Sequence, residues 1–209
     1  MPDWESLIHK DPNNLPHFGV NKVDSMFEVK GNIPLPDARL VFLGDTHHEN
    51  VGIGLSISQF LTTEVKNGDV VLLEGTESGK KVDTTSNMLL NKLGSGATII
   101  GWDDMQAHQK GDRLYNQLDQ LRREYDVATS NVEKIVLGEK YSQLQKTIKE
   151  VVIEKRNLSL TKTLKSLKLD DPNTKIRCFV VLGENHLTKD IQEFSDNIPH
   201  VILSPKPQF

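Results

Sequence analysis

Residues 39–48 read RLVFLGDTHH, and this stretch decides the fold class that the sequence predicts. Its apolar run stops at Gly44, a residue that permits a sharp turn, so we expect a short buried strand followed by a turn. The same arrangement recurs in DVVLLEG (69–75) and in KIRCFVVLG (175–183), where an apolar run also ends beside a glycine. Continuous apolar runs of this length are typical of strands that are buried on both faces.

Helical patterns separate these runs. The long polar region at roughly 106–167 repeats apolar residues at helical spacing, but it exceeds the usual length of a helix in a globular protein. We therefore expect a helical hairpin, broken either near 128–131 or at Gly138. Shorter elements are expected as helices at 52–66, 84–93 and 187–194, and as strands at 97–102 and 200–203. Strands that alternate with helices predict an α/β fold: a mostly parallel central sheet covered by helices, with a long helical hairpin insertion at about 105–167.

Length and composition limit the remaining choices. The 209 residues suit a single α/β domain at 39–209, preceded by an N-terminal arm or loops at 1–38, where Pro, Asn and Asp are frequent. A net charge of −4 without a long basic run argues against nucleic acid as a partner. The N-terminus has no apolar signal region, and no apolar stretch approaches the ~20 residues of a membrane span. We expect no membrane partner, and a location in the cytoplasm or secretion by a route without a Sec signal; the oligomeric state is left open.

The single cysteine, Cys178, lies inside the apolar run 176–182 and cannot form an internal disulfide. Because free cysteines are usually buried, we expect it to fill the core rather than to act as a nucleophile.

Two of the predicted strands are followed by the same pattern, Gly-x-x-His. GDTHH (44–48) follows the first strand, and GENH (183–186) follows the strand at 175–182. Because ligands of parallel sheets bind beyond the carboxyl ends of the strands, we expect histidines from both patterns to meet there. Imidazole binds Zn, Mn, Co or Fe and also acts as a general base near neutral pH. The candidates are His186 together with His47 or His48, since the pattern does not decide which neighbour points inward.

Three further polar residues belong to the same expected site. Glu74 ends a hydrophobic strand, so its carboxylate is a candidate metal ligand or general base, with a turn-stabilising role as the alternative. Arg156 lies in EKRNLSLTKTL (154–164) and is a candidate to clamp Glu74 or to stabilise an oxyanion, with a solvated helix face as the alternative. Asp103 ends the strand at 97–102 and is placed to orient an imidazole.

The ordered motifs resemble those of the superfamily that joins TraB and Tiki proteins, erythromycin esterases and ChaN-like proteins. The likeness rests on VFLGDTHHEN (41–50), VVLLEGTESG (70–79), the Arg-Asn pair at 156–157 and FVVLGENHL (179–187). Members share two Gly-x-x-His elements, a glutamate after the second strand and an arginine on a helix, and GDTHHEN is closest to the ChaN-like form. The resemblance implies an α/β fold in which one cleft is faced by His47, Glu74, Arg156 and His186.

The branches of this superfamily imply different activities. Tiki-like members are proteases that need a divalent ion such as Mn or Co, and erythromycin-esterase-like members hydrolyse an ester with His and Glu. ChaN-like members bind haem and are lipoproteins. This sequence lacks the lipobox cysteine of the ChaN-like branch and the membrane anchor of the Tiki branch.

Three hypotheses follow. In the first, the protein is a hydrolase of an ester or amide bond in a small-molecule or peptide substrate. His47, Glu74 and His186 then hold a divalent metal (Mn, Co or Zn) or activate water directly, Arg156 stabilises the developing charge and His48 faces the substrate. In the second, it is a haem- or metal-binding ChaN-like module without turnover. In the third, the polar cluster only braces the fold.

Overall fold

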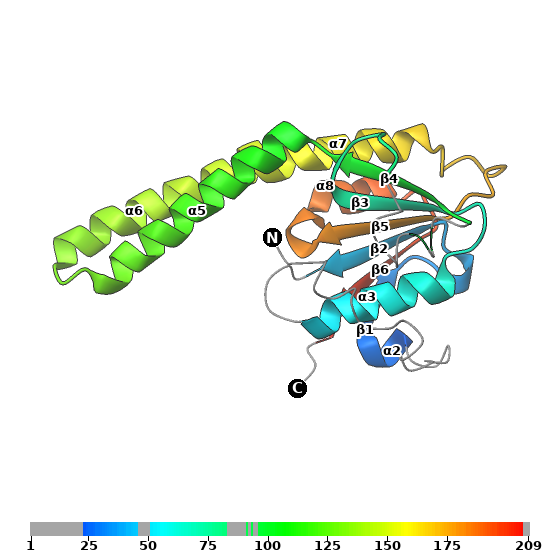
Figure 1. The fold of residues 1–209 in the computed structure, drawn as a ribbon, viewed down its shortest axis with the longest axis horizontal. Helices are drawn as coiled ribbons and strands as arrows, with labels where there is room; N and C mark the ends of the chain where they lie inside the picture. Colours follow the sequence, from blue (N-terminus) through cyan, green and yellow to red (C-terminus); the bar gives the residue numbers. More distant parts are fainter. Residues whose placement is uncertain (1–22, 46–50, 83–90, 92, 94–95, 207–209) are drawn as a thin grey trace.

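The apolar runs form one six-stranded sheet in the computed structural model, which describes residues 23–45, 51–82, 91, 93 and 96–206. The strands are β1 (Phe27–Gly31), β2 (Leu40–Asp45), β3 (Val70–Glu77), β4 (Thr98–Asp103), β5 (Cys178–Gly183) and β6 (His200–Pro205). Their order across the sheet is β1-β6-β2-β5-β3-β4. All neighbours run parallel except β1, which pairs antiparallel with β6 (Figure 1). The prediction of a mostly parallel sheet is confirmed.

Helices cover both faces of this sheet. The helical elements are α2 (Val23–Met26), η3 (Leu35–Asp37), α3 (Val51–Glu64), α5 (Met105–Val127), α6 (Asn131–Ile148), η4 (Lys149–Ile153), α7 (Glu154–Ser166), η5 (Glu184–His186) and α8 (Lys189–Ser195). Successive side chains of a strand point to opposite faces, and this alternation divides the core into two halves. In one half, side chains of α3 pack on the sheet: Ile57, Phe60 and Leu61 with Val41, Leu43, Phe179 and Val181. In the other, α7 and α8 supply the cover: Leu160, Leu164 and Ile191 with Leu40, Phe42, Val180 and Leu182.

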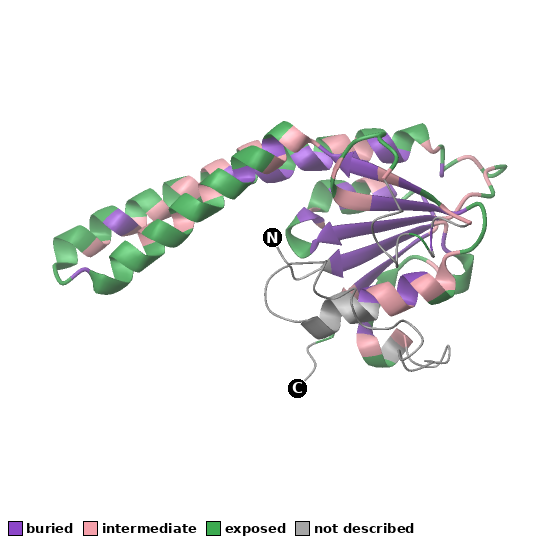
Figure 2. Cartoon of the chain, in the orientation of Figure 1, coloured by how far each residue is buried: buried purple, intermediate pink, exposed green. Residues whose placement is uncertain are grey.

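The predicted helical hairpin is present and extends away from the sheet (Figure 1). It breaks at residues 128–130, between α5 and α6, whereas the alternative break at Gly138 is wrong, since that residue lies within α6. The return helix passes through η4, one turn of π-helix, before it continues as α7. Most of the hairpin surface is exposed, in contrast to the strands (Figure 2).

The structure differs from the sequence prediction at two strands, and one predicted helix lies almost entirely outside the described residues. An arm or loops without regular structure were expected at residues 1–38, but residues 27–31 form the edge strand β1, on which only Phe27 is buried. Strand β5 begins at Cys178, three residues after the expected start, because residues 174–177 leave the ladder. The helix expected at 84–93 falls almost entirely outside the described residues. Cys178 is fully buried, as predicted, and burial raises the pKa of its thiol.

Within the described ranges, the model contains no helix with both the length and the apolar character needed to cross a membrane.

Candidate functional site

The candidate site lies at the carboxyl ends of β3, β4 and β5, where Glu74 is placed by a bulge. Leu73 of β3 pairs with Gly101 of β4, and the next pair is Glu77 with Asp103. The chain therefore advances four residues on β3 but only two on β4 between these pairs. Bulges of this kind re-aim side chains and are common beside active sites. Gly75, directly after Glu74, has a φ of +78°, a conformation that residues with a Cβ rarely adopt. The irregular backbone therefore aims both the Glu74 carboxylate and the Gly75 N–H at the end of the sheet.

Asp103 is the centre of the hydrogen-bond network. Its side chain is completely buried at the end of β4. Oδ1 accepts a hydrogen bond from Arg156 Nε at 2.7 Å, and Oδ2 accepts from Arg156 Nη2 at 2.7 Å and from the Gly75 N–H at 3.0 Å. Burial by itself raises the pKa of the Asp103 carboxyl, but the hydrogen bonds from His108 and Arg156 outweigh it and leave that pKa below its ordinary value. The group is therefore held as a carboxylate.

Arg156 joins two strands through their carboxylates. Besides its bidentate contact with Asp103, its Nη2 donates to Glu74 Oε1, while Glu74 Oε2 accepts the Gly183 N–H of β5 at 2.8 Å. Burial lowers the pKa of the Arg156 guanidinium, but the hydrogen bond to Asp103 and the charge of Glu74 raise it overall, so the side chain stays charged. Of the alternatives in the sequence analysis, the clamp on Glu74 is present and the solvated helix face is wrong, since Arg156 is buried. Its Nη1 has no hydrogen-bond partner among the described residues.

Local helix geometry explains why Arg156 reaches this position. The residue lies in the first turn of α7, directly after the π-helical turn, and the neighbouring Asn157 is buried beside it. Single π-helical turns inside α-helices occur frequently at functional sites, because the extra residue shifts the faces that follow. The hairpin insertion thus returns to the sheet with two adjacent polar side chains turned inward.

Asn157 fixes the orientation of His186. Its Nδ2 donates to the His186 carbonyl at 3.2 Å and to Thr188 Oγ1 at 2.9 Å, so its Oδ1 is the atom that faces His186 Nδ1 at 2.6 Å. An amide oxygen only accepts, and Nδ1 therefore carries the proton. In the neutral ring this leaves the lone pair on Nε2, which is the atom that acts as a base or binds a metal.

The Nε2 atom of His186 lies 3.7 Å from Glu74 Oε1. That distance is too long for a direct hydrogen bond but brings an imidazole nitrogen and a carboxylate oxygen to one spot. The ring is almost completely buried, and its edge meets the indole of Trp102 with centroids 5.3 Å apart. Trp102 also lies under the Arg156 guanidinium, 5.7 Å from the ring centroid, and its Nε1–H donates to the Val181 carbonyl at 3.1 Å. Trp102 therefore forms the apolar base of the site.

Asp103 also binds an imidazole that the sequence analysis did not select. His108, in the first turn of α5, places its Nδ1 3.0 Å from Asp103 Oδ2, and its side chain is 15% exposed. The hydrogen bond to Asp103 raises the pKa of His108, although burial acts in the opposite direction. The expectation that Asp103 orients an imidazole holds for His108. The only sequence signal is indirect: an aspartate at a strand end, five residues before a histidine in the helix that follows.

The other predicted site residues have mixed outcomes. Glu74, Arg156 and His186 are brought together as described, while His47 and His48 lie outside the described residues, so their positions stay predictions. Asp104, the residue after Asp103, caps α5: its Oδ1 accepts the N–H groups of Gln106 and Ala107, both at 3.0 Å.

Two of the three expected metal ligands, Glu74 and His186, are described, and their spacing suits the binding of one ion. Two atoms bound to one tetrahedral ion at about 2.1 Å lie about 3.4 Å apart, close to the 3.7 Å between His186 Nε2 and Glu74 Oε1. The hydrogen bond from His186 Nδ1 to Asn157 is the outer support that metal-bound imidazoles usually have. A group of three His, Cys, Asp or Glu side chains that would hold a metal does not occur in the described ranges, and the third expected ligand, His47, is not in them.

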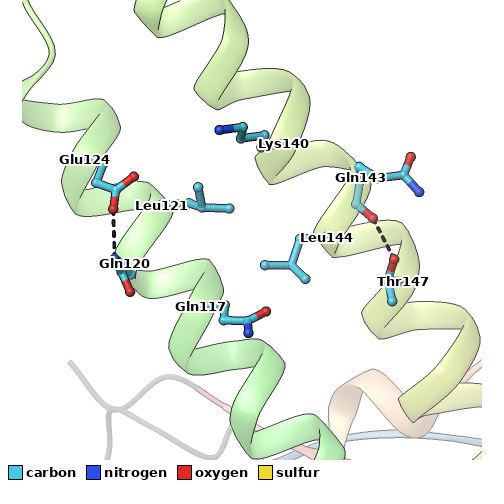
Figure 3. A pocket seen from close by; sticks show the side chains of 8 residues that line it. All are labelled: Gln117, Gln120, Leu121, Glu124, Lys140, Gln143, Leu144 and Thr147. Carbon is cyan, nitrogen blue, oxygen red and sulfur yellow. Dashed lines mark hydrogen bonds between the residues drawn. The ribbon is translucent and has the colours of Figure 1, made fainter.

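Two hollows lie away from this cluster. One is a groove of about 470 Å³ between α5 and α6, where Leu121 and Leu144 lie between polar side chains (Figure 3). The other, of about 630 Å³, lies between α8 and the β1–β6 edge and includes Glu184 and His200. His200 is held by its own segment, since its Nδ1 donates to the Ile198 carbonyl at 3.0 Å. Neither hollow is lined by Glu74, Asp103 or Arg156.

Comparisons with protein-family models, with curated proteins and with solved structures found no match to this chain.

Proposed function

We propose that the protein is a hydrolase of an ester or amide bond and that His186 and Glu74 activate the attacking water. The observation that carries this proposal is the convergence of His186 Nε2 and Glu74 Oε1, 3.7 Å apart, at the carboxyl end of a parallel sheet. Asn157 keeps the lone pair of the neutral ring on Nε2, which is the requirement for a general base. The resemblance of the motifs to those of erythromycin esterases and Tiki proteins supports the same class of reaction.

Charge in the site is arranged for such a reaction. Attack of water on a carbonyl carbon places negative charge on the carbonyl oxygen, and a buried cation stabilises that charge. Arg156 is the buried cation, and its Nη1 is the edge of the guanidinium not used by Glu74 or Asp103. We assign Nη1 to the developing oxyanion. His48 is proposed to face the substrate, as in the sequence analysis.

A divalent metal such as Mn, Co or Zn is compatible with the same residues. His186 Nε2 and Glu74 would hold it together with His47. A bound metal ion lowers the pKa of a coordinated water to about 7 and so supplies hydroxide near neutral pH. With or without a metal, Asn157 orients the imidazole of His186. Arg156 and the Gly183 N–H orient the carboxylate of Glu74.

The test is a screen of nitrophenyl esters and peptide amides with the purified full chain, with and without a chelator, combined with elemental analysis. The variants are Glu74→Gln and His186→Asn, with His47→Ala for the predicted third residue. Glu77→Gln is the matched control, because Glu77 lies on the same strand but is exposed and pairs with Lys80. Loss of a general base typically lowers the rate about 10²- to 10⁴-fold, and the control should retain the full rate.

Activity that survives Glu74→Gln, His186→Asn and His47→Ala would overturn the assignment. A Soret band on addition of stoichiometric haem, without turnover of any substrate, would favour the haem-binding alternative instead. Loss of stability in these variants without any activity in the wild type would favour a structural role for the cluster.

A further inference from the structure

His108 occupies a position in the site that the proposed reaction leaves unused. Its Nδ1 bonds to the same oxygen, Asp103 Oδ2, that accepts hydrogen bonds from Arg156 Nη2 and from the Gly75 N–H. Nη2 of Arg156 in turn contacts Glu74. The His108 ring is thus connected to the proposed water-activating carboxylate through Asp103 and Arg156.

The two imidazoles of the site are held in the same way by partners of different charge. His186 Nδ1 donates to the neutral amide of Asn157, whereas His108 Nδ1 donates to the carboxylate of Asp103. Nε2 is therefore the nitrogen that each neutral ring has left for other contacts: in His186 it lies 3.7 Å from Glu74 Oε1, and in His108 it lies 4.0 Å from Asp112 Oδ2. A carboxylate partner stabilises the imidazolium form, and pairs of titratable groups in contrasting environments commonly divide the roles of acid and base between them.

The face of α5 that carries His108 is turned towards the charged cluster. Tyr115 follows His108 after seven residues, close to two helical turns, so both residues lie on one face. The charges of Arg156 and Glu74 both act on the pKa of the Tyr115 phenol, which burial raises. Helical side chains lean towards the helix N-terminus, which for Tyr115 means back towards the strand ends. The first turn of α5 therefore lies beside the charged cluster, where His108 bonds to Asp103.

We propose that His108 is the general acid of the site and gives the proton on Nε2 to the leaving group. This role rests on the proposed hydrolase function. His186 Nε2 takes one proton of the water while the water oxygen bonds to the carbonyl carbon, and the bond from that carbon to the leaving oxygen or nitrogen breaks. The leaving atom takes its proton from His108 Nε2, while the proton on His108 Nδ1 stays hydrogen-bonded to Asp103. His186 then releases its proton to solvent, and His108 regains one from solvent.

The chemistry of the leaving group provides a test that a merely structural role would not pass. The substrates are p-nitrophenyl butyrate, whose leaving group needs no proton, and ethyl butyrate, whose alkoxide does. His108→Gln should lower kcat on the ethyl ester about 10²- to 10⁴-fold, the usual contribution of a general acid, and leave the nitrophenyl ester within about threefold. Asp119→Asn is the matched control, because Asp119 is an exposed carboxylate farther along α5 and its replacement should affect both esters little.

Equal losses on the two esters would overturn the acid role. A wild-type protein that hydrolyses neither ester, nor any substrate of the wider screen, would contradict the proposed function, and the acid role with it. A nitrogen-15 spectrum of the histidines then reports on the geometry without turnover, with His108 identified by its absence in His108→Gln. We expect the neutral ring to carry its proton on Nδ1. A proton on Nε2 would overturn the acid role whatever the rates, because Asp103 would then not orient the ring.

The acid role also sets a pH dependence. The charged groups that face His108 are Asp103 from β4, Arg156 from α7 and Asp112 from its own helix. For the ethyl ester, kcat should fall as pH rises and His108 loses its proton, and this fall should be absent for the nitrophenyl ester. The same fall for both esters would contradict the proposal.

Discussion

Asn157 holds His186 at two points, with its Oδ1 2.6 Å from the ring Nδ1 and its Nδ2 3.2 Å from the main-chain carbonyl of the same histidine. Both contacts are buried. The single side chain of Asn157 therefore fixes the position of the histidine backbone as well as the rotation and tautomer of its ring.

Asn157→Ala should destabilise the protein and misalign the site. The change leaves a buried N–H and a buried carbonyl of His186 without this partner, a loss that costs about 1–3 kcal/mol for each orphaned group. Leu158→Ala is the matched control, because its side chain is the next one along α7 but is 56% exposed. Urea unfolding of both variants measures the effect. Equal stability of the two would show that the contacts to His186 contribute little.

Arg156→Met should be more damaging than Arg156→Lys. Methionine leaves the buried carboxylates of Asp103 and Glu74 without their cation, and breaking a buried ion pair in this way costs about 3–5 kcal/mol. Lysine keeps the charge but loses the two-pronged contact with Asp103, so a smaller loss is expected. Arg122→Met, on the exposed surface of α5, should change the free energy of unfolding by less than about 0.5 kcal/mol. Indistinguishable effects at positions 122 and 156 would contradict the buried cluster.

Replacing glycine by alanine should lower the stability of the protein at one position and raise it at another. Gly75 has a φ of +78° and open space around the position of a Cβ, so Gly75→Ala meets backbone strain alone, at about 1–2 kcal/mol. Gly138 also has open space but lies within α6, where alanine is favoured over glycine by about 0.5–1 kcal/mol. Thermal unfolding should show a lower Tm for Gly75→Ala and a higher one for Gly138→Ala. Stabilisation by the change at residue 75 would be inconsistent with the bulge geometry.

The Asp103–His108 pair should stabilise the protein at intermediate pH and lose its contribution towards both high and low pH. The pKa of His108 is raised above 6.5, so its stabilising contribution is complete below that value and is lost as pH rises through the folded-state pKa. The pKa of Asp103 is lowered below 3.8, so its contribution is lost as pH falls through the folded-state pKa. The difference in unfolding free energy between the wild type and His108→Gln should therefore shrink over the range in which pH rises above about 6.5, the ordinary pKa of histidine. A difference that grows over this range would mean that the neutral ring is the form stabilised.

Much of the sheet and part of the site could be predicted from the sequence, because buried parallel strands are continuous apolar runs. Such runs mark β2, β3 and β5, and the residues that follow them must meet at one end of the sheet. Strand β1 was missed for the opposite reason: four of its five residues are exposed, so it has no apolar run to detect.

The missed site residues depend on geometry that no short motif records. His108 gains its role only because the first turn of α5 lies beside Asp103. Asn157 was noted as the neighbour of Arg156, but its hold on His186 depends on the π-helical turn that sets the faces of α7. The contact between Asn157 and His186 joins residues 29 apart in the chain and arises only once the insertion has folded back onto the sheet, whereas His108 is five residues from Asp103 and depends on the local turn between β4 and α5.

The hairpin divides into two parts with different tolerance to change in length. Its base, the first turns of α5 and of α7, supplies His108, Arg156 and Asn157, so an insertion or deletion there would rotate these residues away from the strand ends. Its outer part beyond Tyr115 and before η4 contributes no contact to this cluster within the described part of the chain. Related chains can therefore be expected to vary the outer hairpin freely, by whole helical turns, while the carboxyl end of the sheet stays the same.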